Sequence, residues 1–161
     1  MKGNVIVGQS GGPTAAINAS LAGVYRTAKD RGANKVYGML HGIQGLLKEK
    51  YIDLSDHIKT ELDAELLKRT PAAFLGSCRY KLPEIHENRE VYDKIFEILD
   101  KLDIEAFLES IPPDDVEMKH ILALKYVERK TDEEIGDEIG FSRRAIGDKI
   151  DRFLKRQELE T

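Results

Sequence analysis

A cluster of glycines and hydroxyl side chains follows the first apolar segment of the chain, in an order suited to holding a phosphate group. Asn4–Gly8 has the composition of a short buried strand. The residues that come directly after it include Ser10, Gly11, Gly12 and Thr14. Glycines let the backbone approach an anion, and a helix that follows directs its first amide N–H groups at that anion. The sequence therefore predicts a phosphate cradle, although a tight turn explains Gly11 equally well.

The segments around this turn predict a βαβ unit. Pro13 suits the first turn of a helix that extends to about Arg31, and Gly32 is suited to ending it. Apolar residues recur along this helix at helical spacing, at Ile17, Leu21, Val24 and Ala28. Lys35–Met39 then predicts a second strand. The turn matches neither the dinucleotide pattern G-x-G-x-x-G nor the nucleotide pattern G-x-x-x-x-G-K.

Three glycine-containing motifs follow one another in the first 80 residues. They are Gly8-Gln-Ser-Gly-Gly-Pro-Thr-Ala-Ala-Ile-Asn18, Gly38-x-x-x-Gly42-x-x-Gly45-Leu46 and Phe74-Leu-Gly-Ser-x-Arg79. In this order and at these spacings they resemble the start of a phosphofructokinase, particularly the branch that uses pyrophosphate. The resemblance covers residues 1–107. It implies an α/β fold, as a partial Rossmann-like half-domain.

This resemblance also implies which residues contact the phosphoryl donor. By position, Gly11 and Gly12 would lie against the donor, and Arg79, with Tyr80 beside it, would contact its phosphates. A guanidinium group binds phosphate oxygens through two parallel N–H groups, which suits that role. The family implies pyrophosphate or ATP with Mg²⁺ as the donor and fructose 6-phosphate as the acceptor in glycolysis. The plain alternative for Arg79 is a surface arginine.

The residues that perform the reaction in that family do not follow in this sequence. In the family, a strand that begins like Ile104–Phe107 leads into a Gly-Gly-Asp or Gly-Gly-Asn motif for the donor and Mg²⁺. A later segment resembling Thr-Ile-Asp-Asn-Asp carries the catalytic aspartate. No Gly-Gly pair occurs after Gly12 here. Because phosphoryl transfer needs a base, a metal and cationic groups, we expect no catalytic residue, no metal site and a truncated, catalytically deficient chain.

Beyond residue 80 the pattern becomes progressively helical. Thr70–Tyr80 predicts a short strand before a glycine turn, Asn88–Leu102 a helix, and Ile104–Phe107 a further strand. After Pro112-Pro113 no strand pattern occurs. We therefore divide the chain into a phosphofructokinase-like fragment, a junction and a small all-α domain, at residues 1–107, 108–113 and 114–161.

The all-α domain has the pattern of a helix-turn-helix. Asp114–Glu128 predicts a first helix, and Thr131 begins a second, which ends at Ile139. A Gly-Phe turn separates this helix from a third, which Ser142 begins and whose apolar residues are Ile146, Ile150, Phe153 and Leu154. Residues 112–156 are similar to the fourth region of bacterial sigma factors. No segment resembles the sigma region that melts promoters, so a complete sigma factor is not expected.

The third helix of such a domain lies in the major groove of duplex DNA. The residues predicted to face base edges are Ser142, Arg143, Arg144 and Gly147. Those predicted to favour phosphates are Lys149, Arg152, Lys155 and Arg156. Residues 142–156 carry six Lys and Arg against two Asp, a local charge of +4 within an acidic segment. Local positive charge of this kind favours contact with the phosphate backbone. The alternative is a helical bundle with a solvated basic face.

Composition restricts the remaining classes of protein. The chain has 161 residues, a net charge of −4 and 41% hydrophobic residues. No apolar run approaches the ~20 residues that span a bilayer, and the apolar stretch near the N-terminus is too short for a signal peptide. Cys78 is the single cysteine, which excludes an internal disulfide and fits a reducing compartment. We therefore expect a cytoplasmic protein with no membrane partner.

Three interpretations of the whole chain stay open at this point. In one, it is a 6-phosphofructokinase, dependent on diphosphate or ATP. In another, it binds DNA, and its N-terminal part is a remnant or a sensor for a phosphorylated metabolite. The abrupt change of pattern near residue 107 is also typical of a recombination product without a selected function.

Overall fold

The computed structural model describes residues 3–159, with side chains to residue 156. The chain divides into two compact units, residues 1–100 and 101–161. The domain boundary predicted at 107–113 stays a prediction. Within the described residues no helix is both long and apolar enough to cross a membrane.

Unit 1 contains a three-stranded sheet with strand order β1-β2-β3. The strands are β1 (Val5–Gly8), β2 (Val36–Met39) and β3 (Tyr51–Asp53). β1 and β2 are parallel, with Val5 opposite Val36, and helix α1 (Ala15–Asp30) connects them. β3 pairs with β2 in the antiparallel direction. The predicted βαβ unit is therefore confirmed, and the structure is a partial α/β fold.

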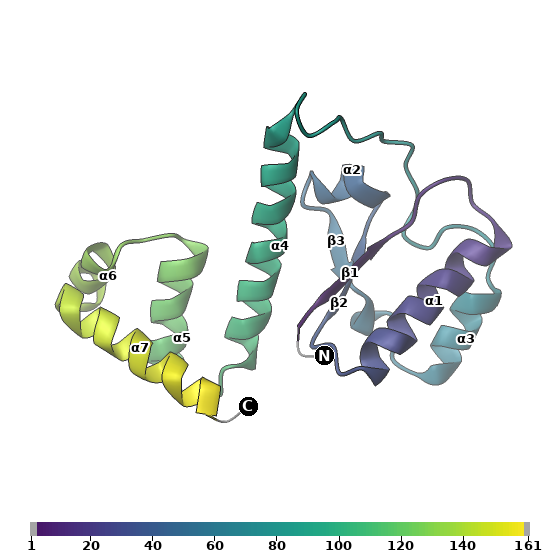
Figure 1. Ribbon diagram of the computed structural model, residues 1–161. Helices are drawn as coiled ribbons and strands as arrows, with labels where there is room; N and C mark the ends of the chain where they lie inside the picture. Colours follow the sequence, from purple (N-terminus) through teal and green to yellow (C-terminus); the bar gives the residue numbers. More distant parts are fainter. Residues whose placement is uncertain (1–2, 160–161) are drawn as a thin grey trace. The chain divides into compact units, whose positions relative to one another are not determined.

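Helices α1 and α3 pack side by side in unit 1 (Figure 1). The chain reaches α3 (Glu61–Arg69) from β3 through a 3-10 turn at Leu54–Asp56. Arg26 of α1 forms ion pairs with Glu61 and with Glu65 of α3, the latter at 2.7 Å. The two helices and the sheet share one core, whose buried side chains are those of Leu21, Ala22, Tyr25, Ala28, Ala33, Val36, Leu54, Ile58, Ala64, Leu67 and Leu75.

Close packing explains the glycines of the second motif. A Cβ atom at Gly38 in β2 would lie 2.6 Å from a methyl carbon of Leu75. At Gly45, in the short helix α2 (Gly42–Leu46), it would lie 1.5 Å from the carbonyl oxygen of Leu40. Since real Cβ contacts are longer than either distance, these positions have no room for a side chain.

A long helix replaces the strand predicted at Ile104–Phe107, and that prediction is wrong. Helix α4 begins at Arg89 and ends at Ser110, passing the predicted end of the helix at residue 102. Ile98, Leu102 and Ala106 recur every four residues and are all buried. This helical periodicity continues through the segment, and no glycine or proline interrupts it.

Unit 2 is helical after α4. Its elements are α5 (Val116–Leu122), a π-helical turn η2 (Ala123–Val127), α6 (Asp132–Ile139) and α7 (Arg143–Leu159). The first helix of this part thus begins two residues later than predicted and continues into a π-helical turn. The helices enclose a second core formed by Leu108, Ile111, Ile121, Leu122, Leu124, Ile135, Ile146, Ile150 and Phe153.

The connection between α6 and α7 is tight. The predicted capping box is present: Thr131 Oγ1 accepts a hydrogen bond from the Glu134 amide, and the Glu134 carboxylate accepts from Thr131 N–H at 2.8 Å. The Thr131 N–H and hydroxyl both donate to this carboxylate and lower the pKa of Glu134, the N–H contributing most. Gly140 ends α6 with a φ of 78°. A Cβ at Gly136 would lie 2.3 Å from the carbonyl oxygen of Phe141, so only glycine admits this return of the chain.

Candidate functional site

A single backbone bridge joins the two segments that carry the predicted phosphate-binding residues. Ser10 and Cys78 pair in the parallel sense, and the Ser10 hydroxyl donates to the Cys78 carbonyl oxygen at 3.3 Å. The four residues predicted to bind the donor flank this bridge: Gly11, Gly12, Arg79 and Tyr80. The strand predicted over Thr70–Tyr80 is reduced to this bridge. The two halves of the predicted site are therefore neighbours, and their role in binding stays a prediction.

The cradle is open to solvent. Gly11 and Gly12 are exposed, as are the side chains of Arg79 and Tyr80. Gly11 has a φ of 91°, so its backbone conformation alone favours glycine. Gly12 has no such conformation, and a Cβ there would meet no atom within 4 Å. Neither φ nor packing within unit 1 accounts for glycine at position 12.

The beginning of α1 faces this loop without a capping side chain. Thr14 is the N-cap residue and makes no side-chain hydrogen bond to the helix. The first turn of α1 contains no acidic residue. The first amide N–H groups of a helix have no partner within the helix and favour an anion.

A buried network of amide side chains positions the cradle, and sequence reasoning missed it. Gln9 donates to Asn18 at 3.0 Å and accepts from the Leu75 amide at 2.8 Å. Asn18 accepts from the Phe74 amide at 2.8 Å and donates to the Thr70 carbonyl oxygen at 2.9 Å. Gln9 and Asn18 are 4% and 1% exposed. The available signal was an amide side chain near each end of the first motif, whose other residues are small or apolar.

Cys78 lies at the same place. It is half-buried, and backbone N–H groups of Gln44, Tyr80 and Ile43, in that order of effect, lower the pKa of its thiol. A Cβ at Gly42 would lie 2.9 Å from its sulfur atom. This packing against α2 gives the cysteine a structural role in holding the loop.

The Mg²⁺ that the family implies does not fit the residues present. Among residues 3–159, no three His, Cys, Asp or Glu side chains gather as ligands for a metal ion. The cradle itself offers hydroxyl, amide and guanidinium groups, whereas Mg²⁺ prefers carboxylate and phosphate oxygens.

In unit 2, the residues predicted to face base edges differ in their surroundings. The Ser142 hydroxyl accepts a hydrogen bond from the Ala145 amide at 3.3 Å and so caps α7. Gly147 lies toward the start of α6, since a Cβ there would be 3.8 Å from a carboxylate oxygen of Asp132. Arg143 and Arg144 are exposed and form no ion pair within the described residues.

Three of the four residues predicted to favour phosphates already have partners within the protein, and one of them is Arg156, which pairs with Asp115 at 2.8 Å. The Lys149 ammonium pairs with Glu117 of α5 at 2.7 Å and lies 4.2 Å from the centre of the Phe141 ring. The Arg152 Nε–H donates to the backbone carbonyl of Asp148 at 3.0 Å. Of the charged residues predicted to contact DNA, Arg143, Arg144 and Lys155 have no such partner within the described residues.

Comparison with known proteins places residues 4–109 within the phosphofructokinase family, whose model they match. Over 106 residues the chain is 42% identical to a pyrophosphate–fructose 6-phosphate 1-phosphotransferase of Xanthomonas campestris pv. campestris, covering 66% of this chain and 25% of that protein. The chain thus spans about a quarter of the length of the curated relatives it matches.

Two solved structures agree with this. A pyrophosphate-dependent phosphofructokinase from Nitrosospira multiformis superposes with a TM-score of 0.55 at 36% identity, over 62% of this chain and 24% of that one. The enzyme of the same name from Marinobacter aquaeolei superposes with a TM-score of 0.52 at 28% identity, over 88% and 31%. The family model matches two thirds of the chain, and the fold of unit 1 and the bridge between the two motif segments agree with that match. The chain therefore belongs to the phosphofructokinase family.

Proposed function

We propose that unit 1 binds pyrophosphate or a similar phosphoryl group at the cradle and that these 161 residues alone do not transfer it. Gly12 carries this proposal, because neither its φ nor its surroundings demand glycine, whereas a phosphate resting on the backbone would. Arg79 and the first amides of α1 supply positive charge at the same place. Within residues 3–159 no group of three possible Mg²⁺ ligands gathers, and the sequence lacks the family's catalytic aspartate motif, so we expect a bound phosphoryl group to have no activated acceptor.

Isothermal titration calorimetry with pyrophosphate tests whether the cradle binds this ligand. We expect Gly12→Val to leave folding unchanged and to weaken pyrophosphate binding at least tenfold, because its side chain occupies the place of the ligand. Arg79→Ala should weaken binding by about tenfold to a hundredfold, the usual effect of losing a charge-assisted hydrogen bond. Gly23→Ala is the control, since Gly23 is an exposed α1 position with open space around it.

A coupled assay with fructose 6-phosphate and either pyrophosphate or ATP tests the second part of the proposal. We expect no turnover above the uncatalysed background. Turnover at a rate typical of a phosphotransferase would overturn the claim that these residues are catalytically deficient. Absence of pyrophosphate binding in the calorimetric titration would refute the proposed binding site, whatever the result of the turnover assay.

We propose a second function, binding of duplex DNA by α6, the Gly-Phe turn and α7 as a helix-turn-helix. The observation that supports it is the first turn of α7, which has no acidic residue and contains Arg143 and Arg144. Positive charge there opposes the helix dipole, so these arginines do not stabilise the helix they begin. Both are exposed, and the N-terminal part of such a helix is the part that approaches base edges.

Fluorescence anisotropy of the full chain with a labelled duplex, over a salt series, tests this proposal. Arg143→Ala together with Arg144→Ala should lower DNA affinity by about tenfold to a hundredfold and flatten the salt dependence. The same change should leave the melting temperature unchanged or slightly raised. Lys119→Ala, an exposed cation of α5, is the control. If the wild-type chain fails to bind DNA even at low salt, the proposal is abandoned.

A further inference from the structure

Two carboxylates of the segment that begins α5 pair with two cations of α7. Lys149 Nζ lies 2.7 Å from Glu117 Oε1, and an Arg156 guanidinium nitrogen lies 2.8 Å from Asp115 Oδ2. Lys149 and Arg156 are seven residues apart, about two helical turns, and therefore lie on the same side of α7. The pairing joins one side of α7 to residues 32 and 41 positions earlier in the chain.

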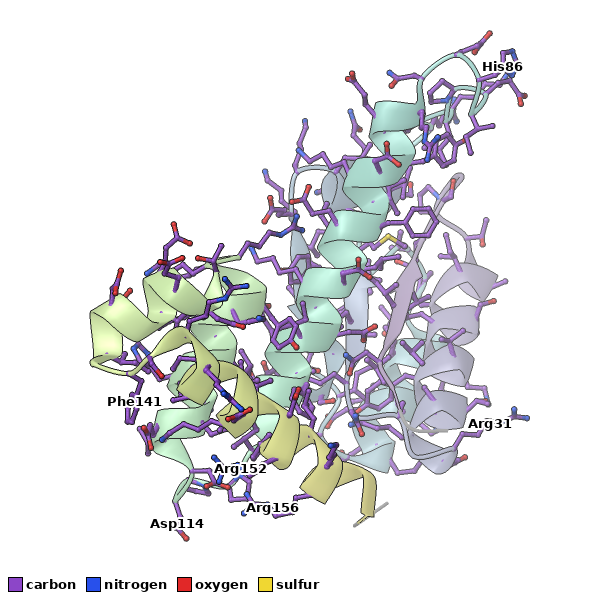
Figure 2. All side chains as sticks on the ribbon, turned by 60° about the vertical axis from the view of Figure 1, so that its left-hand side comes forward. Arg31, His86, Asp114, Phe141, Arg152 and Arg156 are labelled. Carbon is purple, nitrogen blue, oxygen red and sulfur yellow. The ribbon has the colours of Figure 1, made fainter. Side chains whose placement is uncertain are left out.

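A groove lies at this contact. Its volume is about 550 Å³. The residues that line it are Asp115, Met118, Lys149, Arg152, Phe153 and Arg156. Arg152 and Arg156 project from α7 at the end of unit 2 where the chain enters α5 (Figure 2). Three cations and one carboxylate therefore surround a space large enough for a phosphate group.

The carboxylates change the charge that this side of the unit presents. Residues 142–156 carry +4, from six cations and two aspartates, and the carboxylates of Asp115 and Glu117 reduce this to +2. A phosphate that binds Lys149 or Arg156 in the groove competes with the carboxylate already paired to that cation. The internal ion pairs thus reduce the favourable binding free energy that each phosphate contact contributes.

We propose that this groove binds a backbone phosphate of duplex DNA and that Glu117 and Asp115 compete with that phosphate for Lys149 and Arg156. The inference rests on the proposed DNA-binding function of α6 and α7. The ion pairs are partly exposed, with 26% and 57% of the Lys149 and Glu117 side chains accessible. Exposed pairs are weak, so a phosphate can displace the carboxylate. The two acidic residues therefore set the affinity of α7 for DNA.

The test compares neutral variants of the full chain in the anisotropy assay. Glu117→Gln and Asp115→Asn should each raise DNA affinity about threefold, and together about tenfold. The slope of log affinity against log salt should steepen by about one for each cation released to a phosphate. Asp114→Asn is the matched control, because it removes the same charge one residue away and Asp114 forms no ion pair within the described residues. We expect that control to change affinity less than twofold.

A second measurement does not depend on DNA. The rate at which acetic anhydride acetylates Lys149, followed by mass spectrometry, should rise several-fold in Glu117→Gln relative to the wild type. It should not rise in Asp114→Asn. An equal rate in wild type and Glu117→Gln would show that the pair does not form in solution, and the competition would then be rejected.

The outcomes separate the two proposals. If the wild type binds DNA and the double variant gains no more than Asp114→Asn, the competition is wrong and DNA binding stands. If neither the wild type nor any variant binds duplex DNA at low salt, DNA binding and the phosphate groove fail together. Binding by the double variant alone would overturn DNA binding by the wild-type chain while supporting competition by the two carboxylates.

Discussion

Gly45→Ala is expected to destabilise unit 1 by about 4 kcal/mol or more, or to prevent its native folding, because the new Cβ must displace backbone atoms. In the native structure that Cβ would lie 1.5 Å from the Leu40 carbonyl oxygen and 2.7 Å from its carbon. Rotation of a side chain cannot relieve a contact with the backbone. The Gly45 carbonyl oxygen also accepts from the amides of Lys48 and Lys50, at 2.9 Å each, which fixes the loop on its other side.

Hydrogen exchange of peptides from residues 36–54 measures this loss without interference from unit 2. Gly23→Ala is again the matched control. Its Cβ would meet nothing within 4 Å, and alanine is favoured over glycine within a helix by about 1 kcal/mol. We therefore expect the control to gain stability. Native protection in Gly45→Ala would contradict the assigned backbone contact.

Asn18→Leu should cost about 3 to 5 kcal/mol and weaken pyrophosphate binding at the same time. Asn18 is the buried centre of the network, and its loss leaves the Phe74 amide and the Thr70 carbonyl oxygen without their partner. Each buried polar group left unpaired costs about 1–3 kcal/mol. The segment that leads to Arg79 would then lose its attachment to α1, which is why binding should decline as well.

Denaturant unfolding and the pyrophosphate titration check both effects. The control is Ser20→Ala, which removes a hydroxyl that only returns to the Ala16 carbonyl within α1. Adding Gln9→Leu to Asn18→Leu should cost less than the sum of the two single changes, because both side chains belong to one network. Strict additivity would indicate that the two amides act independently.

The local sequence pattern was sufficient to predict much of the secondary structure of unit 1 and the capping of α6. The glycine turn between an apolar strand and an amphipathic segment predicted β1, α1 and β2, and parallel pairing confirmed them. Thr131 and Glu134 predicted a capping box that the structure contains. These features depend on residues close together in sequence, so a single chain is enough to recognise them.

The errors come from relations that extend beyond a local window. Ile104–Phe107 has the composition of a strand, yet the burial of Ile98, Leu102 and Ala106 continues one helical face through it. Expectation of the family's next strand favoured the wrong interpretation. The pairing of Lys149 with Glu117 spans 32 positions and has no periodic signature. Counting the charge of α7 alone therefore overstated the net positive charge of this side of unit 2.

The close packing around Gly38, Gly42 and Gly45 affects what family membership implies about the function of this chain. Contacts with Leu75, Cys78 and Leu40 account for these glycines, so their retention reflects the assembly of the scaffold. A descendant that abandoned phosphoryl transfer would have to keep them as long as it kept the fold. Family membership detected through these positions is therefore evidence of shared architecture, and inheritance of the proposed donor binding must be judged at Gly12 and Arg79.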